Sequence, residues 1–155
     1  MERADEVAVL TPPSVDADRS APTVLIVDDE TAFAATLADI LASKGYRSVV
    51  ASTGIEGMHA AQHMSVDLAL VDLKLPDVSG VEVLARIREI SPFTEVIILT
   101  GQAALDTALR ALNLGAFGYL EKPYDVDRLF LLIERALARR ARRGSESGAP
   151  EASQL

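Results

Sequence analysis

The stretch from Val66 to Gly80, read as VDLALVDLKLPDVSG, constrains the fold more than any other part of the chain. Its apolar residues 68–71 are typical of a strand that is buried on both faces, as the strands of a parallel sheet are. Pro76 and Gly80 indicate that a loop follows. Asp72 is therefore expected at the carboxyl end of a central strand, where open α/β sheets place their chemistry. A carboxylate there costs free energy unless another group pairs with it.

Apolar runs and helical patterns alternate along the rest of the chain. The predicted strands cover residues 23–27, 46–52, 67–72, 95–100 and 117–120. The predicted helices cover residues 31–44, 54–64, 78–90 and 103–114, and a last helix begins after Asp125 and continues into an arginine-rich segment. Strands that alternate with helices through short connections imply a parallel sheet with helices on both faces. The expected fold is thus α/β, with five parallel strands and five helices.

Composition narrows the class of protein. With 155 residues, 49% of them hydrophobic, the chain can form one domain with a proper core. The absence of cysteine excludes a disulfide framework and cysteine-ligated zinc. No apolar run approaches the roughly 20 residues of a membrane span, and the N-terminus lacks the pattern of a signal peptide. We therefore expect a cytoplasmic protein without a membrane partner.

Charge and low-complexity segments divide the chain into three parts. Residues 1–134 carry 21 acidic and 10 basic side chains, and an acidic body argues against direct nucleic-acid binding. Residues 1–22 are expected to be a disordered extension, residues 23–138 the folded domain, and residues 139–155 a basic helix end followed by a flexible tail from residue 144. The arginines of this helix end are interpreted as solvated: Arg135, Arg139, Arg140, Arg142 and Arg143.

Polar residues follow four of the predicted strands. They are Asp28 and Asp29 after the first strand, Asp72 after the third, Thr100 at the end of the fourth, and Lys122 after the fifth. In a parallel sheet these groups gather at one edge, where clustered carboxylates repel and favour a divalent cation such as Mg²⁺. Mg²⁺, a carboxylate, a lysine and a hydroxyl together suit phosphoryl transfer to an aspartate. Each residue taken alone also has a plain structural interpretation, as a helix cap, a turn residue or a solvated charge.

The runs VLIVDDE, LALVDLKLPDVSG, VIILTG and GAFGYLEKP closely resemble the receiver domain of bacterial two-component response regulators. The resemblance covers about residues 23–138. It implies the flavodoxin-like strand order 2-1-3-4-5. It also implies that Asp72 accepts a phosphoryl group from a phosphohistidine on a sensor histidine kinase or phosphotransfer protein.

The same resemblance implies roles for individual residues. Asp28 and Asp29 match the metal-binding acidic pair, and the backbone carbonyl of Lys74 matches a further metal ligand. Thr100 matches the switch hydroxyl and Tyr119 the switch aromatic residue. Lys122 matches the phosphate-contacting lysine, and its bond to Pro123 is commonly cis in this family. The side chains of Lys74 and Gln102 are implied to tune hydrolysis of the acyl phosphate.

Residues 103–135 are predicted to carry the output surface, which would bind a downstream protein or a second copy of the chain. On the helix over residues 103–114, the side chains expected to face the sheet are Leu105, Ala108 and Leu112. Leu109, and Leu131 on the last helix, are expected to be exposed contacts. His59 and His63, four residues apart, are expected to face solvent, because no third metal ligand is evident.

The sequence supports three other functions less well, and it lacks the loop that the flavin or dinucleotide binder among them requires. An aspartyl-nucleophile phosphatase of the haloacid-dehalogenase type needs a second aspartate two residues after the nucleophile, where this chain has Lys74. A flavin or dinucleotide binder needs a glycine-rich loop after the first strand, and the residues there are DDETAF. A receiver-like module that works without phosphorylation is disfavoured by the complete motif. After Leu137 the sequence is too short for a catalytic or DNA-binding module, so we expect no separate enzyme domain.

Overall fold

The computed structural model describes residues 21–101 and 105–154. One sheet of five parallel strands has the order β3-β2-β4-β5-β6, which is the predicted order 2-1-3-4-5. The strands are β2 (Thr23–Val27), β3 (Arg47–Ala51), β4 (Leu68–Asp72), β5 (Glu95–Thr100) and β6 (Gly118–Glu121). The helices are α2 (Thr31–Ser43), α3 (Gly54–His63), α4 (Gly80–Ile90), α5 (Leu105–Asn113) and α6 (Val126–Gln154).

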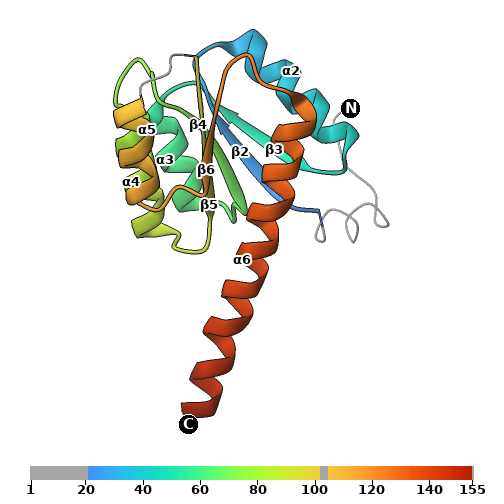
Figure 1. The fold of residues 1–155 in the computed structure, drawn as a ribbon, viewed down its shortest axis with the longest axis vertical. Helices are drawn as coiled ribbons and strands as arrows, with labels where there is room; N and C mark the ends of the chain where they lie inside the picture. The colour runs from blue at the N-terminus through green and yellow to red at the C-terminus, as the bar shows by residue number, and fades with distance from the viewer. Residues whose placement is uncertain (1–20, 102–104, 155) are drawn as a thin grey trace, which may run out of the picture.

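Helices cover both faces of the sheet, so the fold has three layers (Figure 1). Helices α2 and α6 pack on one face, where Leu37 and Leu129 are fully or almost fully buried. Helices α3, α4 and α5 cover the other face, where Leu84 and Ala111 are buried. The central strands β2, β4 and β5 are buried along their whole length. Burial on both faces explains why their sequences are continuous apolar runs rather than alternating patterns.

Helix α2 ends at Ser43, and Gly45, the predicted stop signal, follows its C-cap residue. Gly45 has a φ of 89°, a left-handed conformation that glycine adopts without steric cost. The N–H of Tyr46 donates to the carbonyl of Leu41, so the turn satisfies carbonyl groups that the helix leaves unpaired. Gly115, with a φ of 107°, follows the end of α5 in the same way. Both turns return the chain directly to the sheet, which keeps the connections short.

Helix α5 corrects one sequence-based expectation. Ala108 faces the sheet as predicted, but Leu112 is exposed and Ala111 takes the buried position. A helix turns 100° per residue, so the buried stripe passes through residues 108 and 111 and leaves position 112 at its margin. Leu109 is exposed, as predicted. The side chain of Leu105 and residues 102–104, where the helix was expected to begin, lie outside the described residues.

Helix α6 is longer than predicted. It continues to Gln154 and projects beyond the body of the domain, past the edge of the sheet opposite to the carboxyl ends of the strands (Figure 1). Residues 144–155 were predicted to be a flexible tail because they are small and polar, and helical structure extends through most of them. Once a helix is nucleated, each further residue other than a proline such as Pro150 adds a hydrogen bond, so low local propensity need not end it. Within the described residues, no helix is long and apolar enough to cross a bilayer.

The arginine cluster is not simply solvated, and this corrects a second expectation. Glu95, at the start of β5, has a fully buried side chain. It accepts two hydrogen bonds from Arg139, both 2.6 Å long, and one of 2.9 Å from Arg143. Arg140 forms an ion pair with Asp67 at 3.1 Å. Three arginines of α6 are therefore used to attach this helix to the amino-terminal edge of the sheet. The sequence alone did not predict these pairs, because the partners are more than 40 residues apart.

We expect Glu95→Gln to lower the free energy of unfolding at neutral pH by about 2–3 kcal/mol, because two guanidinium groups lose a buried ionised partner. Burial favours the neutral form of Glu95, but its bonds to Arg139 and Arg143 outweigh burial and lower the pKa below the ordinary value of 4.5. A lowered pKa in the folded state contributes stability above pH 4.5 that is lost as the pH falls through the lowered value.

Urea unfolding at several pH values measures this effect. The difference between the wild type and Glu95→Gln should be complete at pH 7 and should shrink below pH 4.5. Arg142→Gln, which changes an exposed arginine in the same part of α6, is the matched control and should leave stability unchanged. Equal stability of Glu95→Gln and the wild type at pH 7 would show that these ion pairs do not hold α6 in place.

Candidate functional site

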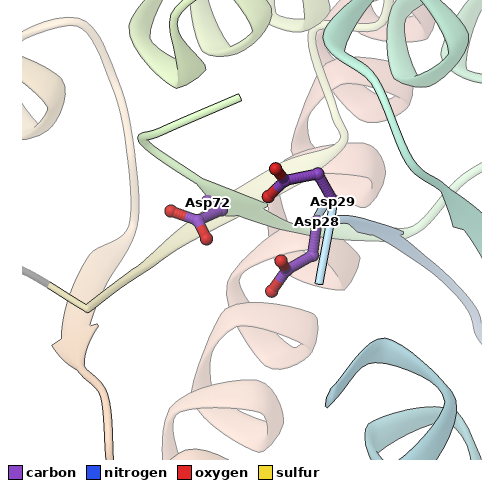
Figure 2. Close-up of side chains that lie close together, drawn as sticks. All are labelled: Asp28, Asp29 and Asp72. Atoms are coloured by element: carbon purple, nitrogen blue, oxygen red, sulfur yellow. The ribbon is translucent and has the colours of Figure 1, made fainter. Parts of the chain in front are cut away.

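The ends of β2 and β4 bring three carboxylates together. The two strands are neighbours in register, with Val27 opposite Val71, so Asp28 and Asp72 lie side by side at the carboxyl edge of the sheet. Asp29 follows directly, and Figure 2 shows the three side chains gathered at these strand ends. Each carboxylate offers an oxygen within 4.8 Å of the others. Asp28 and Asp72 are buried, whereas Asp29 is exposed. The cluster predicted from the sequence is thus present.

Lys122 extends its ammonium group into this cluster. It follows β6, and its N–H donates to the carbonyl of Thr100 at 2.7 Å. Its Nζ donates to Asp28 at 2.7 Å and to Asp72 at 3.0 Å. It also donates to Glu30 at 2.9 Å. The Lys122–Pro123 peptide bond is cis, as the sequence resemblance implied. One cation is therefore shared by three carboxylates.

The electrostatics of the cluster follow from burial and from this sharing. Burial raises the pKa of the Asp28 carboxyl, although its bonds to Lys122 and to the N–H of Glu30 act in the opposite direction. Burial alone would lower the pKa of the Lys122 ammonium, but its bonds to Asp28, Glu30 and Asp72 outweigh burial and raise that pKa. Lys122 therefore carries its charge throughout the physiological pH range. It cannot neutralise all the carboxylates around it.

The residual negative charge and the type of donor atom fit a small divalent cation. Carboxylate oxygens are hard ligands, and Mg²⁺ is usually bound by one or two carboxylates and retained waters. Asp28, Asp29 and Asp72 meet this requirement, and a pocket beside them leaves room for waters. The pocket is lined by Asp29, Glu30, Asp72, Lys74, Thr100 and Gly101. Among the described residues, no other group of three or more acidic, histidine or cysteine side chains could share an ion.

The remaining predicted residues take up different positions around the pocket. Thr100 is buried at the end of β5 and lines the same pocket as Asp72. The backbone N–H of Lys74 donates to Oδ1 of Asp72 at 3.0 Å, which holds the Lys74 backbone beside the carboxylate. Tyr119 lies on β6 with 36% of its surface exposed. His59 and His63 are exposed on α3, with their rings 4.1 Å apart. Gln102 lies outside the described residues.

Two residues of the site were not predicted. The sequence assigned no role to Glu30, yet it binds Lys122 and is the N-cap residue of α2. Tyr124 packs edge-on against Phe33, which lies under the Lys122 ammonium at 4.1 Å from Nζ to the ring centre. Burial raises the pKa of Tyr124 to about 12, so it remains a neutral phenol. The packing of Phe33 against Lys122, and of Tyr124 against Phe33, is visible only in three dimensions.

A doubly wound parallel sheet with an acidic cluster and a shared lysine at its carboxyl edge is the arrangement that the resemblance to receiver domains implied. Residues 24–134 match the model of the response regulator receiver domain. The chain therefore belongs to the receiver-domain family of response regulators.

The transcriptional regulatory protein ZraR of Klebsiella oxytoca is 36% identical over 115 residues, which cover 74% of this chain and 26% of that protein. The regulatory protein AtoC of Escherichia coli is 36% identical over 114 residues, covering 74% of this chain and 25% of that protein. The chain thus spans about a quarter of the length of the curated relatives it matches.

Solved structures of receiver domains are similar to this chain along most of their length. A CheY-like receiver domain from Methanospirillum hungatei has a TM-score of 0.77 at 35% identity, covering 80% of this chain and 99% of that chain. The beryllofluoride-activated dimer of the NtrC4 receiver domain has a TM-score of 0.72 at 36% identity, covering 76% of this chain and 98% of that chain. A response regulator from Burkholderia pseudomallei, solved with a phosphorylated aspartic acid and a calcium ion, has a TM-score of 0.70 at 31% identity. The match covers 86% of this chain and 74% of that chain.

We expect Asp29→Asn to stabilise the metal-free protein, because it removes one negative charge from an unbalanced cluster. The gain should be at most about 1 kcal/mol, the energy of two unit charges roughly 4 Å apart in water. Urea unfolding in the presence of a chelator measures it. Saturating Mg²⁺ should then stabilise the wild type more than the variant. Asp39→Asn, which removes an exposed charge from α2, is the control; an equal gain in that variant would contradict the proposed repulsion.

Proposed function

We propose that this chain is a phosphorylation-dependent signalling switch with Asp72 as the phosphoacceptor. The observation that carries the proposal is the contact of Lys122 with both Asp28 and Asp72 within a cluster of three aspartates. Asp72 is the buried acid at the end of the central strand β4, and its Oδ1 and Oδ2 are oriented by Lys74 and Lys122. Family membership and the phosphorylated aspartic acid of the Burkholderia relative support the same assignment.

The chemistry follows from the geometry. A carboxylate oxygen of Asp72 attacks the phosphorus of a phosphohistidine on a sensor histidine kinase or phosphotransfer protein. A phosphorus–oxygen bond forms, the phosphorus–nitrogen bond breaks, and the imidazole leaves with a proton. Lys122 then moves its hydrogen bonds from carboxylate to phosphoryl oxygens, and the Thr100 hydroxyl donates to one of them. Water later attacks the phosphorus of the acyl phosphate, the bond from phosphorus to the Asp72 oxygen breaks, and inorganic phosphate leaves. The restored carboxylate resets the switch.

Asp28, Asp29, Asp72 and the backbone carbonyl of Lys74 would hold Mg²⁺. When bound, this ion neutralises charge that develops on the transferring phosphoryl oxygens. The residues of the chain supply orientation. Asp28 is held by the N–H of Glu30 at 2.9 Å, and the N–H of Asp28 donates to the carbonyl of Ala51 at 3.0 Å. The neighbouring strand β3 therefore fixes the backbone that carries the acidic pair.

The signal would leave through the face formed by α5, β6 and the first turns of α6, within residues 103–135. Movement of Thr100 toward the phosphoryl group would vacate space beside β6, which Tyr119 could fill by turning inward from its exposed position. Such a change is a population shift driven by contacts made only in the phosphorylated state. The partner would be a downstream protein or a second copy of the chain in the cytoplasm. Four leucines between residues 105 and 135 are at least 36% exposed: Leu109, Leu112, Leu114 and Leu131.

Incubation with a small phosphodonor and Mg²⁺ should add one phosphoryl group to the wild type and none to Asp72→Asn, because the amide lacks a nucleophilic carboxylate oxygen. Intact-protein mass spectrometry measures the product. Asp39→Asn should be labelled like the wild type. If Asp72→Asn is labelled to the same extent as the wild type, Asp72 is not the acceptor.

Beryllofluoride, which mimics the phosphoryl group, should shift NMR signals across residues 105–135 and should produce a homodimer detectable by light scattering. Leu131→Glu should weaken this dimer, since it places a charge on the apolar contact surface. Met64→Glu, which changes an exposed apolar residue at the end of α3, should not. Shifts confined to the metal site would contradict the switch mechanism, and a beryllofluoride-bound monomer would contradict the homodimer alone.

A further inference from the structure

The residues that follow the phosphoacceptor, 73–79, form a loop that we call the acceptor loop. Its two ends are closed by a hydrogen bond of 2.9 Å from the N–H of Gly80 to the carbonyl of Leu73. A side chain on Gly80 would collide with the carbonyl of Asp72 and would stand 2.7 Å from Cα of Leu73. The loop therefore closes tightly at its base. Its middle needs a separate attachment, because a hydrogen bond at the base does not hold the tip.

That attachment is Asp77. Although this residue is exposed, its carboxylate accepts hydrogen bonds from the backbone N–H groups of Gly54 at 2.8 Å and Ile55 at 2.9 Å. These are the first two residues of α3, so their N–H groups have no partner within the helix. A carboxylate at a helix N-terminus also interacts favourably with the helix dipole. The N–H of Val78 donates to the same carboxylate at 2.8 Å, which fixes the direction of the side chain.

Packing around Gly54 supports the same attachment independently. A Cβ atom at position 54 would collide with the side chain of Val78 and would stand 3.0 Å from that of Val83. The absence of a side chain at the start of α3 is thus what lets the acceptor loop approach the helix. Thr53 caps the next N–H, that of Glu56, at 3.1 Å, so the helix has a cap of its own that does not involve the loop. The contribution of Asp77 can therefore be separated from helix capping in general.

The acceptor loop also carries Lys74, whose backbone N–H binds Asp72 and whose carbonyl is the proposed metal ligand. We propose that Asp77 is a positioning residue for the phosphoacceptor site: by tying the acceptor loop to the N-terminus of α3, it holds the Lys74 backbone where Mg²⁺ and Asp72 need it. This inference rests on the proposed metal site. Without the tether, the loop would sample other conformations, and metal binding would have to order it.

The test is the affinity of the full chain for Mg²⁺, measured by titration of backbone amide NMR signals without any phosphodonor. Asp77→Ala should weaken binding by about tenfold or more, as is typical when a residue that orients a metal ligand is removed. Asp77→Asn retains one acceptor oxygen for the helix N–H groups, so its affinity should be intermediate. Amide hydrogen exchange at Lys74 should become faster in Asp77→Ala even when no metal is present.

Thr53→Ala is the matched control, because it removes a cap from the same helix and leaves the acceptor loop attached. It should bind Mg²⁺ as the wild type does. Wild-type affinity in Asp77→Ala, or an equal loss in Thr53→Ala, would overturn the positioning role. If Asp77→Ala does not fold, the comparison of Asp77→Asn with Thr53→Ala decides in the same way. Asp72→Asn distinguishes the two levels of the proposal: undiminished Mg²⁺ affinity in that variant overturns the metal site itself.

Discussion

The ammonium group of Lys122, shared by the carboxylates of Asp28, Glu30 and Asp72, is the interaction on which the carboxyl edge of the sheet depends. Two buried carboxylates on adjacent strands would otherwise repel each other across a short distance. The lysine offsets part of that repulsion and leaves the cluster with excess negative charge. Lys122 thus reduces the repulsion between the carboxylates, and the remaining net negative charge favours the binding of a cation. In the proposed function, phosphoryl oxygens next to Asp72 would compete with the carboxylates for the hydrogen bonds of Lys122.

At the amino-terminal edge of the sheet, a buried carboxylate is fully paired with cations. There, Glu95 is surrounded by Arg139 and Arg143, and the ion pairs attach α6 rather than leave a binding site. Strand β5 connects the two edges, since Glu95 is its first residue and Thr100 its last. The strand is buried along its length and lies between β4 and β6. The ion pairs of Glu95 attach the long helix α6 to the amino-terminal edge of the sheet, whereas the carboxyl edge retains unbalanced negative charge.

Between these edges, the acceptor loop shows how neighbouring helices support a site at the end of a strand. Asp77 connects the loop to α3, and Ser79 begins α4 with reciprocal hydrogen bonds to Glu82. The loop is therefore held by two helix N-termini that pack on the same face of the sheet. Helix N-termini are suitable anchors because their N–H groups need acceptors. The positions of the proposed metal ligands would thus depend on parts of the chain that contact neither metal nor phosphate.

The sequence by itself determined the element order, the parallel sheet and the grouping of Asp28, Asp29, Asp72, Thr100 and Lys122. These follow from local signals: apolar runs predict buried strands, and strands that alternate with helices place their carboxyl ends on one edge. Only the tertiary structure decided which residues pair over long distances. The contacts of Glu30 with Lys122, Arg139 with Glu95, and Asp77 with the start of α3 join residues 92, 44 and 22–23 positions apart. The exposure of Leu112 was misjudged for a related reason, since periodicity describes a helix alone, and packing against the sheet decides which face is buried.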